Sequence, residues 1–230
     1  MVTGGLSCKG SYHEINQDSF ICKSVKNGYI LALSDGMGSK RYSQFGSKAI
    51  CEILKQEFEN ENTPLKQMEW IPFLKKCHKK WIETVGEFDV TQCYATMLVL
   101  LIQDNCLKAA RLGDGFLSIL ADDMDYILMD HKDDYFANET DCLMAEFDEE
   151  HLEILELIFD KFTGAVACSD GIEIGIMREE EIMSFTKEFM FEYARMPADE
   201  CREDINGWVS SWPGIDDKTI AYMIEEVEAE

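Results

Sequence analysis

Apolar residues near the start of the chain form two short runs, 20–25 and 29–34, separated by Asn27-Gly28. Asn-Gly between two such runs is a strong signal of a β-hairpin, because both residues accept the positive φ that its tight turn requires. The two runs are therefore predicted to pair as antiparallel strands. Asp18 lies just before the first run and Asp35 just after the second, so this pairing brings both carboxylates to the same end of the hairpin.

From residue 42 the apolar positions recur every three or four residues, which is the spacing of one face of an α-helix. A first helix is predicted over 42–58. A second helix is predicted to begin at Thr63-Pro64, with a threonine N-cap followed by proline at the first helical position, and to run to Val85. Pro72 is expected to kink or split this second helix, because proline inside a helix removes a backbone hydrogen bond.

Strand-like runs return at 93–103, 106–112, 116–121 and 126–129, joined by tight polar turns. Four runs in this order predict a meander, with Asp114 in a connection between two of its strands.

The remaining segments repeat the order of strands followed by helices. Their predicted elements are a loop over 133–141, a strand or short helix over 152–159 with the strand preferred, a buried strand over 163–169, helices over 182–196 and 201–212, and a closing strand over 219–225. A short strand at 6–8 precedes all of these elements. Two pairs of amphipathic helices can cover the outer faces of two packed antiparallel sheets. The sequence therefore predicts an α+β fold, a four-layer α-β-β-α sandwich with two antiparallel sheets flanked by helix pairs, in a single domain over residues 1–230.

Composition narrows the functional classes. The net charge of -24 argues against nucleic acid as a partner and against anionic membrane surfaces, because both would repel the chain. The nine cysteines include no Cys-x-x-Cys pair, which favours a reduced, cytoplasmic protein over a disulfide or zinc scaffold. The longest apolar run, 95–102, is far shorter than the roughly 20 residues of a membrane-spanning helix.

Aspartates recur where apolar runs begin or end. Five of them do so, namely Asp18, Asp35, Asp114, Asp170 and Asp216. Any single Asp-Gly is also an ordinary turn signal. If these strand ends converge, however, the carboxylates cannot all stay ionised without bound cations, and oxygen-only ligands suit Mg²⁺ or Mn²⁺. A site for two metal ions is the simplest resolution.

Six short motifs in order carry a family resemblance. They are Asn-Gln-Asp-Ser at 16–19, Ser-Asp-Gly-Met-Gly-Ser at 34–39, Tyr-Ala-Thr-Met at 94–97, Leu-Gly-Asp-Gly at 112–115, Cys-Ser-Asp-Gly-Ile at 168–172 and Asp-Asp-Lys-Thr at 216–219. In this order the chain resembles the metal-dependent serine/threonine protein phosphatases, or type 2C phosphatases, especially their compact bacterial branch. The fold of that family is the sandwich predicted above.

The resemblance implies a role for each matching residue. Asp35 would bridge two Mg²⁺ or Mn²⁺ ions, with the Gly36 carbonyl on the second ion, and Asp170 and Asp216 would hold the first. Asp18 would act through bound water. Asp114 would help to hold a third, weaker ion. Two divalent ions can activate a water molecule for in-line attack on phosphorus, so no protein nucleophile is required.

The chain departs from the family pattern near the predicted substrate phosphate. Many relatives have an arginine where this chain has His13, and a glutamate where it has Gln17. His13 is assigned as a catalytic hydrogen-bond donor to the phosphate, with an ordinary structural histidine as the alternative. Met37 stands where some relatives have a histidine, and Gly-Asp-Gly-Phe at 113–116 replaces Gly-Asp-Ser-Arg.

The resulting hypothesis is a cytoplasmic bacterial enzyme that removes phosphate from serine or threonine on a protein partner, opposed by a cognate serine/threonine kinase. The alternative is a regulatory or phosphoprotein-binding module that keeps the fold without useful turnover. A phosphatase for small phosphorylated metabolites would share the same site and differ in its surrounding loops.

Overall fold

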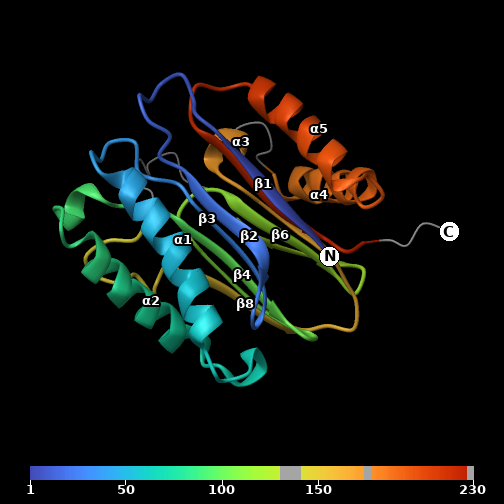
Figure 1. Cartoon of the computed structure of the whole chain (residues 1–230), viewed down its shortest axis with the longest axis horizontal. Helices are drawn as coiled ribbons and strands as arrows, with labels where there is room; N and C mark the ends of the chain where they lie inside the picture. Colours follow the sequence, from blue (N-terminus) through green and yellow to red (C-terminus); the bar gives the residue numbers. More distant parts are fainter. Residues whose placement is uncertain (130–140, 174–177, 227–230) are drawn as a thin grey trace.

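The computed structural model describes residues 1–129, 141–173 and 178–226, which build two stacked antiparallel sheets of five strands each (Figure 1). The first sheet has the order β1 (Val2–Cys8), β10 (Lys218–Ile224), β9 (Phe162–Cys168), β6 (Phe116–Ala121) and β7 (Met124–Leu128). The second has the order β2 (Ser19–Val25), β3 (Gly28–Ser34), β4 (Met97–Gln103), β5 (Cys106–Leu112) and β8 (Glu153–Ile158).

Helices cover the outer face of each sheet. The second sheet is covered by α1 (Ser43–Asn60) and α2 (Trp70–Val85), and the first by α4 (Glu179–Tyr193) and α5 (Ala198–Ser211). The short α3 (Asp170–Glu173) follows β9, and 3₁₀ turns occupy Leu65–Gln67 and Val90–Gln92. The predicted four-layer α-β-β-α sandwich is therefore confirmed.

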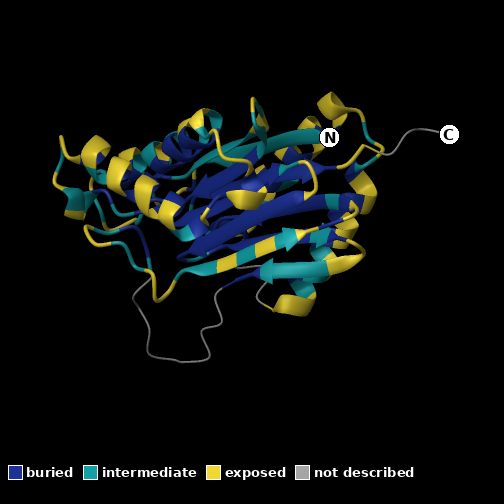
Figure 2. Cartoon of the chain, turned by 90° about the horizontal axis from the view of Figure 1, so that it is seen from below, coloured by how far each residue is buried: buried dark blue, intermediate teal, exposed yellow. Residues whose placement is uncertain are grey.

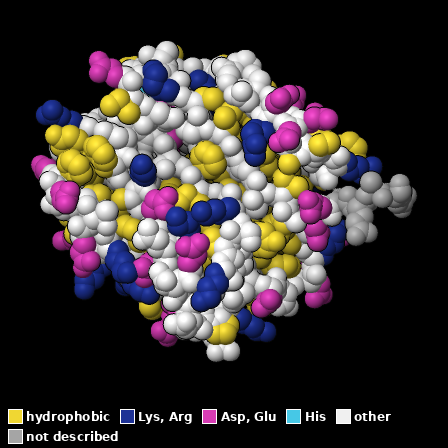
Figure 3. Space-filling model, viewed as in Figure 1, with side chains coloured by type: hydrophobic (Ala, Val, Ile, Leu, Met, Phe, Trp, Pro, Cys, Tyr) yellow, Lys and Arg dark blue, Asp and Glu magenta, His cyan; other side chains and the backbone are white. Residues whose placement is uncertain are grey.

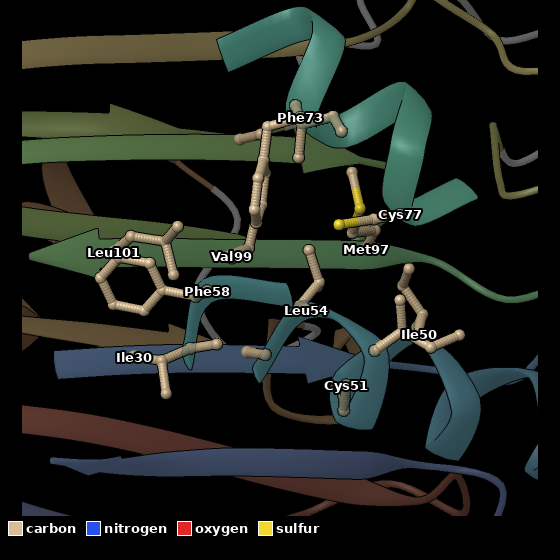
Figure 4. Packing of buried hydrophobic residues seen from close by; sticks show 14 of the residues in the cluster. Ile30, Ile50, Cys51, Leu54, Phe58, Phe73, Cys77, Met97, Val99 and Leu101 are labelled. Carbon is tan, nitrogen blue, oxygen red and sulfur yellow. The ribbon is translucent and has the colours of Figure 1, made fainter. Parts of the chain in front are cut away.

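Three apolar cores hold the layers together, one under each helix pair and one between the sheets. Buried residues fill the centre of the molecule, while the outer faces of the helices are exposed (Figure 2). Under α1, Ile50, Leu54 and Phe58 pack toward Ile30 of β3 and Val99 of β4 (Figure 4). Burial of each such side chain stabilises the fold by about 1.5–3 kcal/mol, so β3 is held firmly in place.

The predicted hairpin is present and its register is simple. Ser19 pairs with Ser34, and Val25 pairs with Gly28 at the turn, where the φ of Gly28 is 141°. Asp18 and Asp35 are the next residues outward from the Ser19–Ser34 pair. The closed end of the hairpin is thus remote from these two carboxylates, as expected from the sequence.

The predicted meander is wrong, because its four strands belong to different sheets. Strands β4 and β5 pair in the second sheet, whereas β6 and β7 belong to the first. The chain changes sheets at Gly113-Asp114-Gly115, where the glycines have φ values of 101° and 87°. A Cβ at either glycine would lie 2.5 Å from a backbone carbonyl oxygen, so only glycine fits this crossing. Alternation of apolar residues sets the face of a strand and carries no information about which sheet it joins.

The prediction for the second helix also needs correction. Pro72 neither kinks nor splits α2, because it lies in the first turn, where its missing N–H would have no partner within the helix. The break comes earlier: Leu65–Gln67 forms a separate 3₁₀ turn with Pro64 at its N-cap, and Met68 after it is extended. The helix therefore begins at Trp70 and not at the predicted Thr63-Pro64.

The other predicted elements agree with the structure in type, with ends that shift by a few residues. The ambiguous segment 152–159 is a strand, and the first strand is longer than predicted. Most of the predicted loop over 133–141 lies outside the described residues. No helix within residues 1–129, 141–173 and 178–226 has the length and apolar character to cross a membrane.

Candidate metal centre

Asp18 connects the two sheets at the end of the sandwich where the β2–β3 hairpin is open. Its Oδ2 accepts hydrogen bonds from the Ser169 hydroxyl, directly after β9, at 2.9 Å, and from the Thr219 hydroxyl in β10 at 2.6 Å. Its other oxygen, Oδ1, is buried and has no hydrogen-bond partner. Burial raises the pKa of Asp18 to about 7, although the hydrogen bond from Thr219 acts in the opposite direction.

The Asp35 side chain interacts with the side chains of both Asp18 and Asp170. Burial raises the pKa of Asp35 well above its ordinary value, and the negative charges of Asp18 and Asp170 raise it further. Burial also raises the pKa of Asp170, where the charges of Asp216 and Asp114 contribute in the same direction. The five carboxylates predicted from separate motifs thus interact at one end of the sheets.

This cluster has the chemistry of a cation site. The Oδ1 atoms of Asp18 and Asp170 are buried without a hydrogen bond. Such atoms cost free energy unless a proton or a cation neutralises them. All the donors are oxygens, which favours a hard divalent ion such as Mg²⁺ or Mn²⁺. The residues present therefore fit the metals that the motifs predict.

The backbone around Asp35 is fixed by Thr96, which lies just before β4. The Thr96 hydroxyl accepts a hydrogen bond from the Asp35 N–H at 2.9 Å, and the Thr96 N–H donates to the Asp35 carbonyl at 2.8 Å. The Ser34 hydroxyl donates to the Thr96 carbonyl at 2.5 Å. The Tyr-Ala-Thr-Met motif therefore has a structural explanation, since it holds the predicted bridging carboxylate in position.

Gly36 is enclosed on two sides. A Cβ at this position would lie 2.8 Å from the Gln17 carbonyl oxygen and 2.8 Å from the backbone of Ser43. The Gly36 N–H donates to the same Gln17 oxygen at 3.1 Å, and Met37 N–H donates to the Tyr94 carbonyl at 3.0 Å. Glycine is required here because the turn is packed between the start of α1 and the segment that carries Asp18.

The two consecutive aspartates before β10 have different environments. Asp217 is buried and accepts hydrogen bonds from the backbone N–H groups of Gly10 and Gln17, each at 2.7 Å. It thereby fixes both ends of the loop over 10–17. Asp216 lies 3.2 Å, Oδ1 to Nε2, from His13 in that loop. The sequence indicated an Asp-Asp pair at this strand, and only the structure distinguishes the buried anchor from the residue beside the cluster.

His13 lies against the glycine turn that follows Asp35. A Cβ at Gly38 would lie 2.8 Å from Cε1 of the His13 ring, so the absence of a side chain at Gly38 makes room for the imidazole. With Nε2 on Asp216, the ring connects that carboxylate to the turn. The residue that replaces the family arginine is therefore at the edge of the cluster.

A second group of titratable residues lies beside Asp114. Ligand atoms of Asp141, Asp148 and His151 lie within 4.8 Å of one another, and His151 Nδ1 is 2.7 Å from Asp148 Oδ2. The hydrogen bond with Asp148 raises the pKa of His151, with the charge of Asp141 adding to it. The contacts of His151 with both carboxylates account for the group as an ion-pair network wherever the histidine is protonated. Sequence reasoning missed this group, because its members are separated by a loop and match no motif.

Comparisons with solved structures identify the class of the fold. A bacterial serine phosphatase superimposes with a TM-score of 0.75 over 100% of both chains at 15% identity. The serine/threonine phosphatase Stp1 from Staphylococcus aureus gives 0.72 at 15% identity and covers 99% of this chain and 95% of its own. The catalytic domain of the phosphatase PstP, solved with 2 manganese ions, gives 0.66 at 18% identity over 97% and 98%. At these identities the likeness shows the fold.

The sequence model of the protein phosphatase 2C family matches residues 10–210. The chain therefore belongs to the protein phosphatase 2C family and is a metal-dependent protein serine/threonine phosphatase, as the resemblance of its motifs predicted. No curated protein sequence matches the chain as a relative.

Proposed function

We propose that this enzyme hydrolyses phosphoserine or phosphothreonine on a protein substrate at the Asp18–Asp35–Asp170 cluster, in a single phosphatase domain over residues 1–230. The observation that carries the proposal is the interaction of these three half-buried carboxylates with one another, with buried and unpartnered Oδ1 atoms on Asp18 and Asp170. When bound, Mg²⁺ or Mn²⁺ ions supply an activated water and neutralise the phosphoryl oxygens.

The residues have separate tasks in this proposal. Asp35, Asp170, Asp216 and the carbonyl of Gly36 would hold the two metal ions, and Asp18 would act through bound water. Ser169 and Thr219 orient Asp18 by donating to its Oδ2, while Oδ1 has no hydrogen-bond partner. Asp114, whose charge acts on Asp170, would help to hold a weaker third ion.

His13 is proposed to orient Asp216 and to stand where the substrate phosphate enters. Its Nε2 is 3.2 Å from Asp216 Oδ1, so a hydrogen bond there fixes the carboxylate. This contact also favours the second candidate function, a phosphoprotein-binding or regulatory module. A histidine engaged by Asp216 offers less charge to a phosphate than the arginine of many relatives would.

The proposal also covers the location of the enzyme and its partners. We place the enzyme in the cytoplasm as a signalling phosphatase, opposed by a cognate serine/threonine kinase. The net charge of -24 argues against nucleic acid as its partner. On the face shown in Figure 3, acidic and basic side chains are interspersed, without a broad basic area.

The proposal is tested by phosphate release from a phosphothreonine peptide and from p-nitrophenyl phosphate with Mn²⁺. Asp35→Asn is expected to lower kcat by about 10³-fold, equivalent to about 4 kcal/mol of transition-state stabilisation. Asp123→Asn is the matched control, because Asp123 has a side chain that is 87% exposed and a positive φ that asparagine accepts. If the parent protein binds Mn²⁺ and the phosphopeptide yet releases no phosphate, the regulatory module is correct instead.

A second test needs no substrate. Because the folded pKa of Asp18 is raised, protonated Asp18 stabilises the metal-free protein below its ordinary pKa, and this stability is lost as the pH rises through 7. The free energy of unfolding in EDTA should therefore fall by about 2 kcal/mol between about pH 5.5 and pH 7.5. Asp18→Asn should remove the share of this dependence that Asp18 contributes, while Asp35 and Asp170, whose pKa values are also raised, still titrate. Mn²⁺ should reverse the sign of the dependence, because metal binding requires the carboxylates to lose their protons.

A further inference from the structure

A groove of about 300 Å³ lies between α4 and α5 on the outer face of the first sheet. We call it the α4/α5 groove. Its floor is aromatic and consists of Phe185, Phe189, Tyr193, Trp208 and Trp212. Its rim is acidic and consists of Glu188, Glu192 and Asp204. Among the described residues, none that line the groove is basic.

The aromatic floor is rigid before anything binds. Trp208 Nε1 donates a hydrogen bond to the Tyr193 hydroxyl at 3.0 Å, and that hydroxyl donates to Asp204. Trp208 also makes edge-to-face contacts with Phe185 and Trp212, at ring distances of 6.2 and 5.5 Å. Burial and the bond with Asp204 raise the pKa of Tyr193, so its hydroxyl remains a donor. A preformed floor reduces the entropy that a bound segment must lose.

The rim determines which kind of ligand the groove favours. Glu188 and Glu192 are exposed and lie one helical turn apart on α4, beside the aromatic rings. A cationic side chain placed over an indole ring and next to carboxylates gains both a cation–π interaction and an ion pair. An anionic ligand would be repelled by the same three acids.

We propose that the α4/α5 groove docks a segment of a partner protein in which an arginine or lysine adjoins a large apolar residue. The apolar side chain packs on the aromatic floor, and the cation lies between the indole faces and the rim. This surface is separate from the carboxylate cluster, so the proposal does not depend on the metal chemistry.

The position of the groove suits an enzyme that acts on proteins. Trp212 at one end of the groove donates through Nε1 to the Ile172 carbonyl at 3.2 Å. Ile172 belongs to α3, which begins at Asp170 of the carboxylate cluster. A segment docked in the groove therefore lies on the side of the molecule where α3 leads to the candidate metal centre (Figure 1).

The four tryptophans make the test site-specific. Trp208 and Trp212 line the groove, whereas Trp70 and Trp81 are buried in α2 on the other helix layer. A labelled ten-residue peptide of alternating arginine and leucine is titrated into the full chain, and the indole N–H signals are followed by NMR. We expect the signals of Trp208 and Trp212 to shift and those of Trp70 and Trp81 to stay in place.

Charge-matched variants separate docking from general attraction to an acidic protein. Glu188→Lys/Glu192→Lys should weaken peptide binding by about tenfold, because it reverses the rim. Glu83→Lys/Glu87→Lys makes the same change in net charge at exposed positions around the end of α2 and should alter the Kd less than about twofold. An arginine–glycine peptide should bind about fivefold more weakly than the arginine–leucine peptide.

The proposal is overturned by any of three results. They are equal weakening in both double variants, equal affinity of the arginine–glycine peptide, and binding that leaves the Trp208 and Trp212 signals unchanged. Dispersed indole signals in each free variant establish that it is folded, so a loss of binding is not a loss of structure.

Discussion

The two helix layers of the sandwich are built differently, although each covers one sheet. The α1/α2 layer is closed around Trp81, which is fully buried and donates through Nε1 to the Gly46 carbonyl at 2.9 Å. The α4/α5 layer encloses an open groove whose tryptophans are partly exposed. The closed layer packs on β3, which carries Asp35, and the open layer adjoins α3, which begins at Asp170. One layer therefore fixes the site and the other leaves a surface for a partner.

The largest expected difference between the layers comes from truncating a tryptophan in each. Trp81→Ala should lower the free energy of unfolding by about 4 kcal/mol, because it leaves a cavity and removes the hydrogen bond to the Gly46 carbonyl. Trp212→Ala should lower it by about 1.5 kcal/mol, since the ring is partly exposed and loses one hydrogen bond to Ile172. Urea unfolding measures both values. Equal losses would show that the α4/α5 layer is as closely packed as the other.

The sequence predicted the apolar face of each helix in both layers, but it did not predict that the two layers differ in how closely their helices pack. Apolar spacing over 182–196 and 201–212 identifies the inward face of each helix. It does not determine how closely two helices approach, so it cannot show that Phe185 and Trp208, which lie on these apolar faces, also line a groove. Tight approach in the other layer depends on Gly46, which the pattern of apolar positions does not distinguish.

The part of the candidate site that depends on neighbouring residues in the sequence was predictable. The hairpin signal at Asn27-Gly28 was enough to bring Asp18 and Asp35 to one end of the hairpin, although the turn itself is Lys26-Asn27 and Gly28 already pairs with Val25. The hydroxyls that hold Asp18 come from residues 151 and 201 positions away, and such contacts have no local pattern. For the same reason the change of sheet at Gly113–Gly115 was missed, while the strands on either side of it were correct.

One glycine in each helix layer gives a smaller difference, because substitution by alanine should have opposite effects on stability at the two positions. A Cβ at Gly46 in α1 would collide with the Cys93 carbonyl oxygen, whereas a Cβ at Gly207 in α5 would meet nothing within 4 Å. Gly46→Ala should therefore destabilise the protein by about 2 kcal/mol. Gly207→Ala should stabilise it by about 0.5–1 kcal/mol, because alanine restricts the unfolded chain and favours the helix. Thermal unfolding of both variants, with helix content checked by circular dichroism, gives the comparison. A stabilising Gly46→Ala would contradict the closed packing of α1 on the segment around Cys93.

The smallest expected difference concerns one glutamate in each layer. Glu57 of α1 has a 6% exposed side chain and pairs with Lys76 and Lys80 of α2 at 2.9 and 2.5 Å. Burial acts to raise the pKa of Glu57, but the hydrogen bonds from the two lysines outweigh it, so the pKa is lowered. The ionised form therefore stabilises the folded state above the ordinary pKa of 4.5, and this contribution is lost as the pH falls through the folded value.

Glu57→Gln should accordingly cost about 1 kcal/mol at neutral pH, and its difference from the parent should shrink below about pH 4.5. Glu188→Gln, on the exposed rim of the α4/α5 groove, should change stability by less than about 0.5 kcal/mol at either pH. Urea titrations at about pH 7 and pH 4 measure both variants. A cost for Glu57→Gln that persists unchanged in acid would mean that the glutamate acts through packing, and that the ion pairs with Lys76 and Lys80 contribute nothing to closing the α1/α2 layer.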